Sequence, residues 1–212
     1  ARLQPGFFCM CGIVALVGSR EAAPQLLEGL RQLEYRGYDS AGIATVAAQG
    51  QLTCLRAKGK LRNLTACFEA EGAPGQCGIG HTRWATHGKP EERNAHPHRS
   101  SDGAVAVVQN GIIENHRALR EQLEASGVVF QSETDTEVIP HLLAAELKQL
   151  QASGGTPGGG VLLEALQQVL PKLQGAYALA VIWDQAPGAL VVARKAAPLL
   201  IGLGEGEFLC AS

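Results

Sequence analysis

The sequence lacks three features that would assign it to a class at once: a large net charge, a long apolar run and a Cys-x-x-Cys pair. Its 18 basic and 20 acidic side chains leave a formal net charge of −2, so no basic field attracts nucleic acid or anionic lipid. Gly, Pro or a charged residue interrupts every apolar run before the roughly 20 residues that span a bilayer. We therefore expect neither a nucleic-acid nor a membrane partner.

The cysteines are scattered, and several lie within expected strands or helices, where small buried thiols are ordinary. They are Cys9, Cys11, Cys54, Cys67, Cys77 and Cys210. This usage favours a reducing, cytoplasmic environment. All but the first two are expected to be buried and inert, and Cys11 is the exception developed below. The 212 residues fit one domain with a substantial core.

Apolar periodicity predicts the elements of the chain. Strands are expected at residues 12–17, 41–47, 52–58, 77–82, 104–109, 176–183, 189–193, 199–202 and 207–211, and helices at 24–35, 61–70, 138–150 and 161–173. The turn at Gln49-Gly50-Gln51 joins two of these strands as an antiparallel hairpin. Two strand clusters around a helical middle predict a layered α+β domain, with its sheets between helices.

Two polar segments of the helical middle are interpreted structurally. Thr134-Asp135-Thr136-Glu137 matches the capping box before the helix at 138–150. The glycine-rich stretch at 151–160 lacks the Lys-Ser/Thr signature of a phosphate-binding loop, so it is expected to be a surface loop without chemistry.

Met10-Cys11-Gly12 leads straight into the first expected strand. If Cys11 becomes the chain terminus, it carries both a thiol nucleophile and an α-amine, which titrates near roughly pH 7.7 to 8.0 and can act as a base. With the leader 1–10 in place, Cys11 has only an amide nitrogen, which cannot take a proton. Met10 could be the true start, the leader could be cleaved, or the chain could carry it and be inactive. We favour the first two, because the Met10-Cys11-Gly12-Ile13 pattern would otherwise serve no purpose. The leader itself is too short and too weakly apolar for a secretory signal.

Three further segments carry donors or charges suited to a small zwitterion. Arg83 follows an expected strand and could hold a carboxylate with its bidentate fork, or form a surface ion pair. Asn110-Gly111 could be a hairpin turn, or an oxyanion hole made of a side-chain amide and a backbone N–H. Asp135 could stabilise a helix N-terminus or bind an ammonium group. Together with Cys11, these groups describe amide hydrolysis on an α-amino acid.

Six motifs in this order resemble the glutaminase domains of the N-terminal-nucleophile amidotransferases. They are Met10-Cys11-Gly12-Ile13, Tyr35 to Gly42, His81 to Gly88, Asn94 to His98, Asn110 to Asn115 and Ser132 to Glu137. Tyr38-Asp39-Ser40 and the segment from Trp84 to His87 favour the fructose-6-phosphate branch over the phosphoribosylpyrophosphate and asparagine branches. The resemblance implies an αββα four-layer sandwich of two mainly antiparallel sheets.

The resemblance also implies a role for each motif residue. Cys11 attacks the side-chain amide of L-glutamine, its α-amine relays the proton, ammonia leaves, and water releases glutamate from a thioester. Asn110 and Gly111 form the oxyanion hole, while Arg83 holds the α-carboxylate and Asp135 the α-amine. Further residues line or shape the pocket: Thr86 and His87, Trp84 as an ammonia gate or a packed aromatic, and Arg36 with Gly37 beside the nucleophile. No cofactor is implied.

The resemblance covers residues 11–212 as one glutaminase domain. In the family, two isomerase domains that bind fructose 6-phosphate follow it, in a full-length protein expected to be a homodimer. Without them, the chain is not expected to make the amino-sugar phosphate. Two alternatives stay open: a metal site among His81, His87, His96, His98, Cys9 and Cys11, and a glutamine-binding module whose leader blocks the amine of Cys11.

Overall fold

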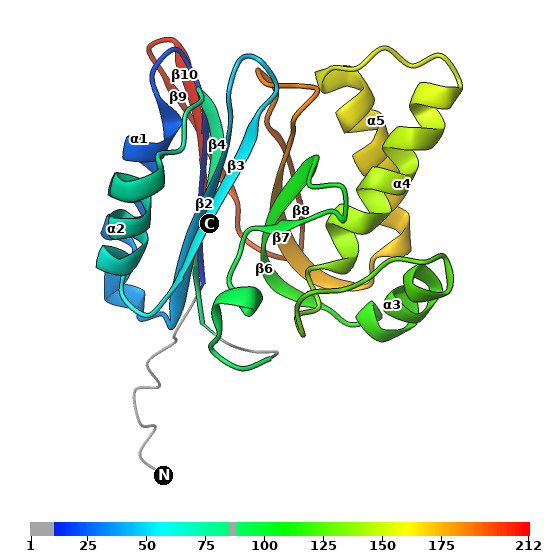
Figure 1. Cartoon of the computed structure of the whole chain (residues 1–212), viewed down its shortest axis with the longest axis horizontal. Coiled ribbons are helices and arrows are strands. Elements are labelled where there is room, and N and C mark those ends of the chain that lie inside the picture. The colour runs from blue at the N-terminus through cyan, green and yellow to red at the C-terminus, as the bar shows by residue number, and fades with distance from the viewer. Residues whose placement is uncertain (1–10, 85–87) are drawn as a thin grey trace.

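Two β-sheets face each other, and helices cover the outer face of each, so the molecule has four layers in the order α, β, β, α (Figure 1). The structure is a computed structural model that describes residues 11–84 and 88–212. The α+β four-layer sandwich expected from the sequence is confirmed. Within the described residues, no helix has the length and apolar character that crossing a membrane requires.

Within the described residues, ten strands form the two sheets, and every hydrogen-bonded pair of neighbouring strands is antiparallel. The first sheet has the order β3-β2-β4-β1-β10-β9, with β1 Gly12–Val17, β2 Ser40–Val46, β3 Leu52–Lys58, β4 Cys77–Arg83, β9 Leu200–Gly204 and β10 Glu207–Ala211. The second has the order β5-β6-β7-β8, with β5 His98–Arg99, β6 Val105–Ile113, β7 Gly175–Trp183 and β8 Val191–Lys195.

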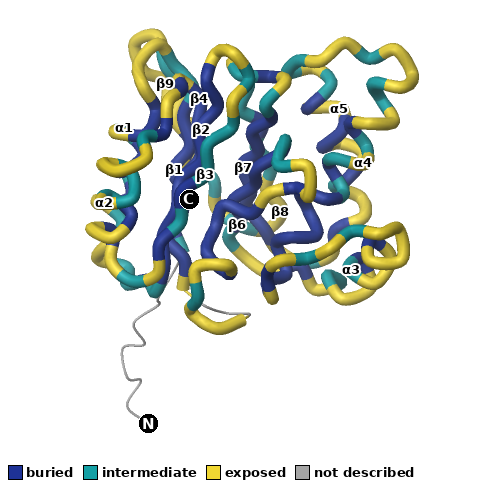
Figure 2. The backbone as a smooth tube through the Cα atoms, viewed as in Figure 1, coloured by how far each residue is buried: buried dark blue, intermediate teal, exposed yellow. Residues whose placement is uncertain are grey.

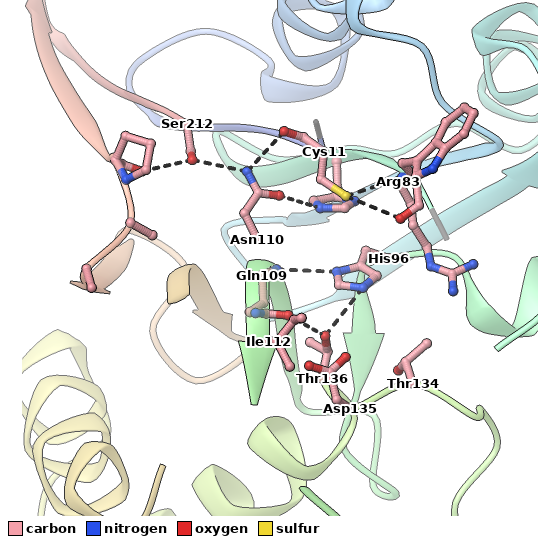
Figure 3. A pocket seen from close by; sticks show the side chains of 16 residues that line it. Cys11, Arg83, His96, Gln109, Asn110, Ile112, Thr134, Asp135, Thr136 and Ser212 are labelled. Atoms are coloured by element: carbon pink, nitrogen blue, oxygen red, sulfur yellow. Dashed lines mark hydrogen bonds between the residues drawn. The ribbon is translucent and has the colours of Figure 1, made fainter. Parts of the chain in front are cut away.

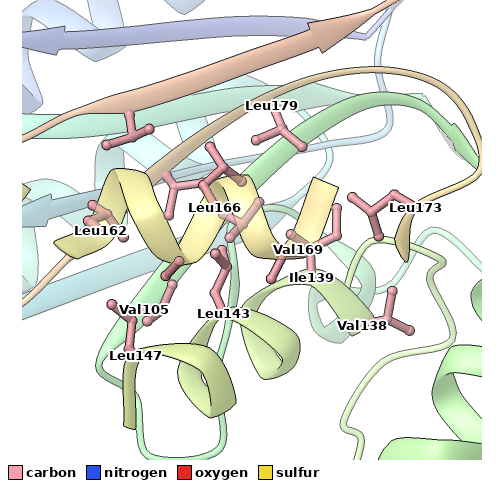
Figure 4. Close-up of a cluster of buried hydrophobic side chains, with 14 of the residues drawn as sticks. Val105, Val138, Ile139, Leu143, Leu147, Leu162, Leu166, Val169, Leu173 and Leu179 are labelled. Atoms are coloured by element: carbon pink, nitrogen blue, oxygen red, sulfur yellow. The ribbon is translucent and has the colours of Figure 1, made fainter. Parts of the chain in front are cut away.

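Helices α1 (Ala22–Gln32) and α2 (Leu61–Glu71) pack on the first sheet. Helices α3 (His116–Ala125), α4 (Val138–Ala152) and α5 (Gly159–Val169) pack on the second sheet. Leu143 of α4 and Leu166 of α5 lie buried in this second core (Figure 4). Burying each such leucine stabilises the fold by about 1.5–3 kcal/mol.

The space between the sheets follows from the period-2 alternation of the strands. In β1, Ile13 and Ala15 face the second sheet, whereas Val14 and Leu16 face helix α1. Both sets are buried, which explains why the central strands are continuous apolar runs (Figure 2). The inner layer is rich in alanine, including Ala178 of β7. Small side chains there allow the two sheets to pack closely.

Several sequence predictions need correction. Strand β6 does not end at residue 109 but continues through Asn110 and Gly111 to Ile113. The capping box does not form, because the Glu137 carboxylate accepts hydrogen bonds from the N–H groups of residues 131 and 132, before the helix. Helix α3 and strand β5 were not expected. The glycine-rich loop is shorter than 151–160, because α4 and α5 extend into it.

The cysteine prediction is correct only in part. Cys77 and Cys210 are buried, whereas Cys54 and Cys67 are half-buried. Burial raises the pKa of Cys77 to about 12 and that of Cys210 to about 11. Burial also raises the pKa of Cys54. These three thiols are therefore protonated at neutral pH.

Candidate active site

A cavity of about 340 Å³ opens at one end of the sandwich, where strands of both sheets meet the loop before α4 (Figure 3). This volume lies within the roughly 300–1,000 Å³ of small-molecule pockets. Six predicted site residues line the cavity: Cys11, Arg83, Trp84, Asn110, Gly111 and Asp135. The other lining residues are His81, His96, Gln109, Ile112, Thr134, Thr136, Ala196, Ala197, Pro198 and Ser212.

Strand pairing brings Cys11 next to Trp84. Because β1 and β4 are antiparallel and Gly12 pairs with Thr82, the same register places Cys11 opposite Arg83, and Trp84 is the next residue along the chain. The backbone N–H of Trp84 donates to the Sγ atom of Cys11 over 3.2 Å. Burial raises the pKa of the Cys11 thiol, and the Trp84 hydrogen bond and the Arg83 charge oppose this rise only in part. The thiol therefore needs a base to become a nucleophile.

Arg83 is the last residue of β4 and only 3% exposed, so the interpretation as a surface ion pair is wrong. Its Nη1 atom lies 3.7 Å from Oδ1 of Asp39. Its Nη atoms donate to the backbone carbonyls of Gly88 and Lys89, each over 3.4 Å. Burial lowers the pKa of Arg83, and Asp39 opposes that shift. The side chain thus brings a positive charge, held by its neighbours, to the wall of the cavity.

Asn110 lies within β6, paired with Ala178 of β7, so the hairpin-turn interpretation of Asn110-Gly111 is wrong. Its Nδ2 atom donates to the backbone carbonyl of Cys11 over 3.3 Å and to Oγ of Ser212 over 3.0 Å. Gly111 follows at φ +108, and a Cβ atom there would lie 2.1 Å from the carbonyl oxygen of Ala176. Only glycine fits this position without displacing the backbone.

Asp135 lies at the other end of the cavity from Cys11 (Figure 3). It is 4% exposed, and its Oδ2 atom accepts a hydrogen bond of 2.7 Å from the backbone N–H of Ile113. This bond fixes the carboxylate, while Oδ1 has no hydrogen bond to a described residue. The carboxylate can therefore accept a hydrogen bond from an ammonium group in the cavity.

The remaining predicted site residues differ in position. Arg36 and Gly37 do not line the cavity, but Nη1 of Arg36 donates to the backbone carbonyl of Ser212, which does line it, over 3.1 Å. Trp84 lines the cavity and is 43% exposed, so it is not a buried core aromatic. Its role as an ammonia gate stays a prediction. Thr86 and His87 lie outside the described residues.

Three buried histidines, for which the sequence suggested only a metal site, stack at and behind the cavity wall. His81 of β4 and His96 stack with ring centroids 4.2 Å apart, and His98 of β5 meets His96 edge-on at 4.7 Å. In the sequence, these histidines are marked by their clustering in two of the six motifs, His81 to Gly88 and Asn94 to His98. Among residues 11–84 and 88–212, no three His, Cys, Asp or Glu side chains are arranged to hold a metal ion. His87 and Cys9, two of the proposed ligands, lie outside this part.

A family model described as a glutamine amidotransferase domain matches residues 81–212, more than half of the chain. The chain belongs to the glutamine amidotransferase domain family. Residues 11–80, which precede the matched segment, supply Cys11 and strands β1, β2 and β3 of the first sheet.

Two curated relatives and one solved structure illustrate the similarity. Glutamine--fructose-6-phosphate aminotransferase (isomerizing) of Thermosynechococcus vestitus is 60% identical over 96% of this chain and 31% of its own length. The enzyme of the same name from Nostoc sp. is 59% identical over 96% of this chain and 32% of its own length. The amidotransferase domain thus spans about a third of these relatives.

A solved glutamine phosphoribosylpyrophosphate amidotransferase from B. subtilis superimposes with a TM-score of 0.75 at 29% identity. The match covers 95% of this chain and 41% of that one. The similarity therefore extends across both sheets and is not confined to the residues of the cavity.

Proposed function

We propose that this domain hydrolyses the side-chain amide of L-glutamine to glutamate and ammonia, through a γ-glutamyl thioester on Cys11. The observation that carries the proposal is the cavity itself. It brings a thiol, a guanidinium, a carboxylate and a side-chain amide together in a space that suits one small amino acid.

The two charged groups recognise the two ends of the amino-acid backbone. Arg83 attracts the α-carboxylate, and Asp135 accepts hydrogen bonds from the α-ammonium group. Both side chains are buried and held by hydrogen bonds before the substrate arrives, so little side-chain entropy is lost on binding. The side-chain amide of glutamine is then directed toward Cys11.

The chemical step needs a base, because burial keeps the Cys11 thiol protonated. When Cys11 is the chain terminus, its α-amine takes the thiol proton as sulfur bonds to the amide carbon. Asn110 Nδ2 and the N–H of Gly111 stabilise the negative oxygen of the tetrahedral intermediate. The protonated α-amine of Cys11 then gives its proton to the amide nitrogen of glutamine, the C–N bond breaks, and ammonia departs. Water hydrolyses the thioester and restores the thiol.

The relatives suggest which substrate accepts the ammonia. The names of the two curated relatives state fructose 6-phosphate as the substrate that receives nitrogen. We propose that the domain supplies ammonia for the same reaction, glucosamine-6-phosphate formation, when it is joined to the other two thirds of such an enzyme.

The test compares a chain that begins at Met10-Cys11, from which Met10 is removed, with the chain as printed. Intact mass identifies the terminus of each species, and glutamate release measures hydrolysis. We expect activity only where Cys11 is the first residue. Cys11→Ala should abolish hydrolysis yet keep glutamine binding by calorimetry, whereas Cys67→Ala, in helix α2 away from the cavity, should keep both.

Retained activity in Cys11→Ala would refute the assignment of the nucleophile. Full activity in a species that mass spectrometry shows to begin at Ala1 would refute the role of the α-amine. If every species, including the one that begins at Cys11, bound glutamine without hydrolysing it, the domain would be a binding module and the proposed function would be wrong.

A further inference from the structure

The side-chain amide of Asn110 has a defined orientation in the structure. Its Nδ2 atom faces the backbone carbonyl of Cys11, which can only accept a hydrogen bond. Its Oδ1 atom therefore points the other way, to Nε2 of His81 at 2.8 Å. An amide turned by half a rotation would bring two carbonyl oxygens together beside Cys11 and lose the hydrogen bond to the Cys11 carbonyl.

His81 is suited to hold this orientation because it is a donor in a dry environment. It is 1% exposed and stacks on His96. Burial lowers the pKa of His81 to about 4, so the imidazole is neutral at neutral pH. A neutral imidazole has one N–H, and since Oδ1 of Asn110 can only accept, that hydrogen lies on Nε2.

The pair lies where the two sheets meet. His81 has the same parity in β4 as Ile79, and Asn110 has the same parity in β6 as Val108, and both of these apolar residues belong to the layer between the sheets. The hydrogen bond thus joins β4 of one sheet to β6 of the other, at the wall of the cavity.

We propose that His81 is a positioning residue for glutamine hydrolysis: its Nε2–H holds Oδ1 of Asn110, so that Nδ2 is presented at the backbone of Cys11. This inference rests on the proposed function, in which Asn110 Nδ2 stabilises the oxyanion. His81 contacts no reacting atom and acts through Asn110. Its contribution is expected in the transition state, because the negative oxygen develops only there.

Two substitutions separate the hydrogen bond from the packing of the ring. The amide nitrogen of the glutamine in His81→Gln reaches approximately the place of Nε2, the imidazole nitrogen that contacts Asn110. The shorter asparagine in His81→Asn places its amide nitrogen near the position of Nδ1, which does not contact Asn110. Both variants bury an amide in place of the imidazole. Only the first keeps a donor for Oδ1 of Asn110.

The experiment measures kcat and KM for glutamine hydrolysis by the chain that begins at Cys11. We expect His81→Gln to stay within about 5-fold of the parent, and His81→Asn to lose about 10- to 100-fold in kcat with little change in KM, less than the ~10²–10³ lost with a whole oxyanion-hole donor. In an Asn110→Ala background, both substitutions should have the same small effect, because His81 then has no amide to hold.

A second measurement does not depend on turnover. L-Glutamate γ-semialdehyde adds to the Cys11 thiol as a hemithioacetal, whose oxygen occupies the oxyanion position. Its affinity should fall in His81→Asn by the same factor as kcat, while the affinity for L-glutamate and the rate of Cys11 alkylation by iodoacetamide stay within about 3-fold of the parent. Thermal unfolding checks that each variant folds.

Equal activity of the Gln and Asn variants would overturn the inference, as would an equal loss from His81→Asn with and without Asn110. A parent chain that begins at Cys11 and releases no glutamate would overturn the proposed function, and this inference with it. An active parent with indistinguishable variants overturns the inference alone.

Discussion

Acidification should destabilise the domain steeply between pH 6.5 and 5, because three imidazoles are buried in their neutral form. Burial lowers the pKa of His81 to about 4 and that of His98 to about 3. Burial also lowers the pKa of His96, and the neighbouring histidines and the positive charges of Arg83 and Arg56 add to this shift. Glu137 opposes the shift at His98.

The sign follows from proton binding. In the unfolded chain each histidine takes up a proton near pH 6.5, whereas the folded chain takes it up only at a much lower pH. The stabilisation is therefore complete above pH 6.5 and is lost as pH falls toward the folded pKa values. At 1.36 kcal/mol per proton and pH unit, three histidines give a limiting slope of about 4 kcal/mol per pH unit. Between pH 7 and 5 the loss is about 6 kcal/mol, comparable to the whole stability of many domains.

Urea unfolding, followed by circular dichroism at several pH values from 7 to 5, measures this slope. The lowered pKa of Glu137, about 2, places its contribution below this window, since carboxylates in unfolded chains titrate near pH 4. His98→Gln should reduce the limiting slope by about a third, because two of the three buried imidazoles then remain. A free energy of unfolding that stays constant from pH 7 to 5 would refute the reasoning.

Two substitutions test the cavity wall. Arg83→Ala should raise KM for glutamine about 10- to 100-fold and lower kcat much less, since a charged hydrogen-bonded contact contributes about 1.5–3 kcal/mol to binding. Glutamate release measures both constants. A fall in kcat at unchanged KM would contradict this role. Gly111→Ala should cost at least ~2 kcal/mol in urea unfolding, because φ is +108 and the new Cβ meets a backbone carbonyl. Gly160→Ala, in helix α5 with open space around it, is its control and should be neutral or stabilising.

The sequence predicted elements whose signal is local and strong. Apolar runs between turn residues located β1, β2, β3 and β4, and their bounds are within one or two residues of the structure. Helix α3 was missed because only Leu119 and Leu123 mark its buried face, and the other residues are mostly polar. That i, i+4 pair was the signal available, but two large apolar residues in ten leave a helix and a surface loop equally plausible.

Local signals misled where tertiary pairing decides. Asn110-Gly111 is a strong turn dipeptide, but β7 offers Ala178 and Tyr177 as antiparallel partners, and the positive φ of Gly111 is accommodated inside the strand. Likewise, Thr134 and Glu137 have capping-box spacing, yet the Glu137 carboxylate satisfies backbone N–H groups of the loop that precedes them. No spacing rule contains these longer-range partners.

The cavity residues continue the alternation that builds the layer between the sheets. Cys11 has the parity of Ile13, Arg83 and His81 that of Ile79, and Asn110 that of Val108. At this end of the sandwich, polar groups therefore replace the apolar side chains of the inner layer. The buried ones among them, such as Arg83 and His81, are costly to bury without a hydrogen-bond partner. The histidine stack supplies such a partner to Asn110, and the acid sensitivity of the fold is the consequence of keeping that amide oriented toward Cys11.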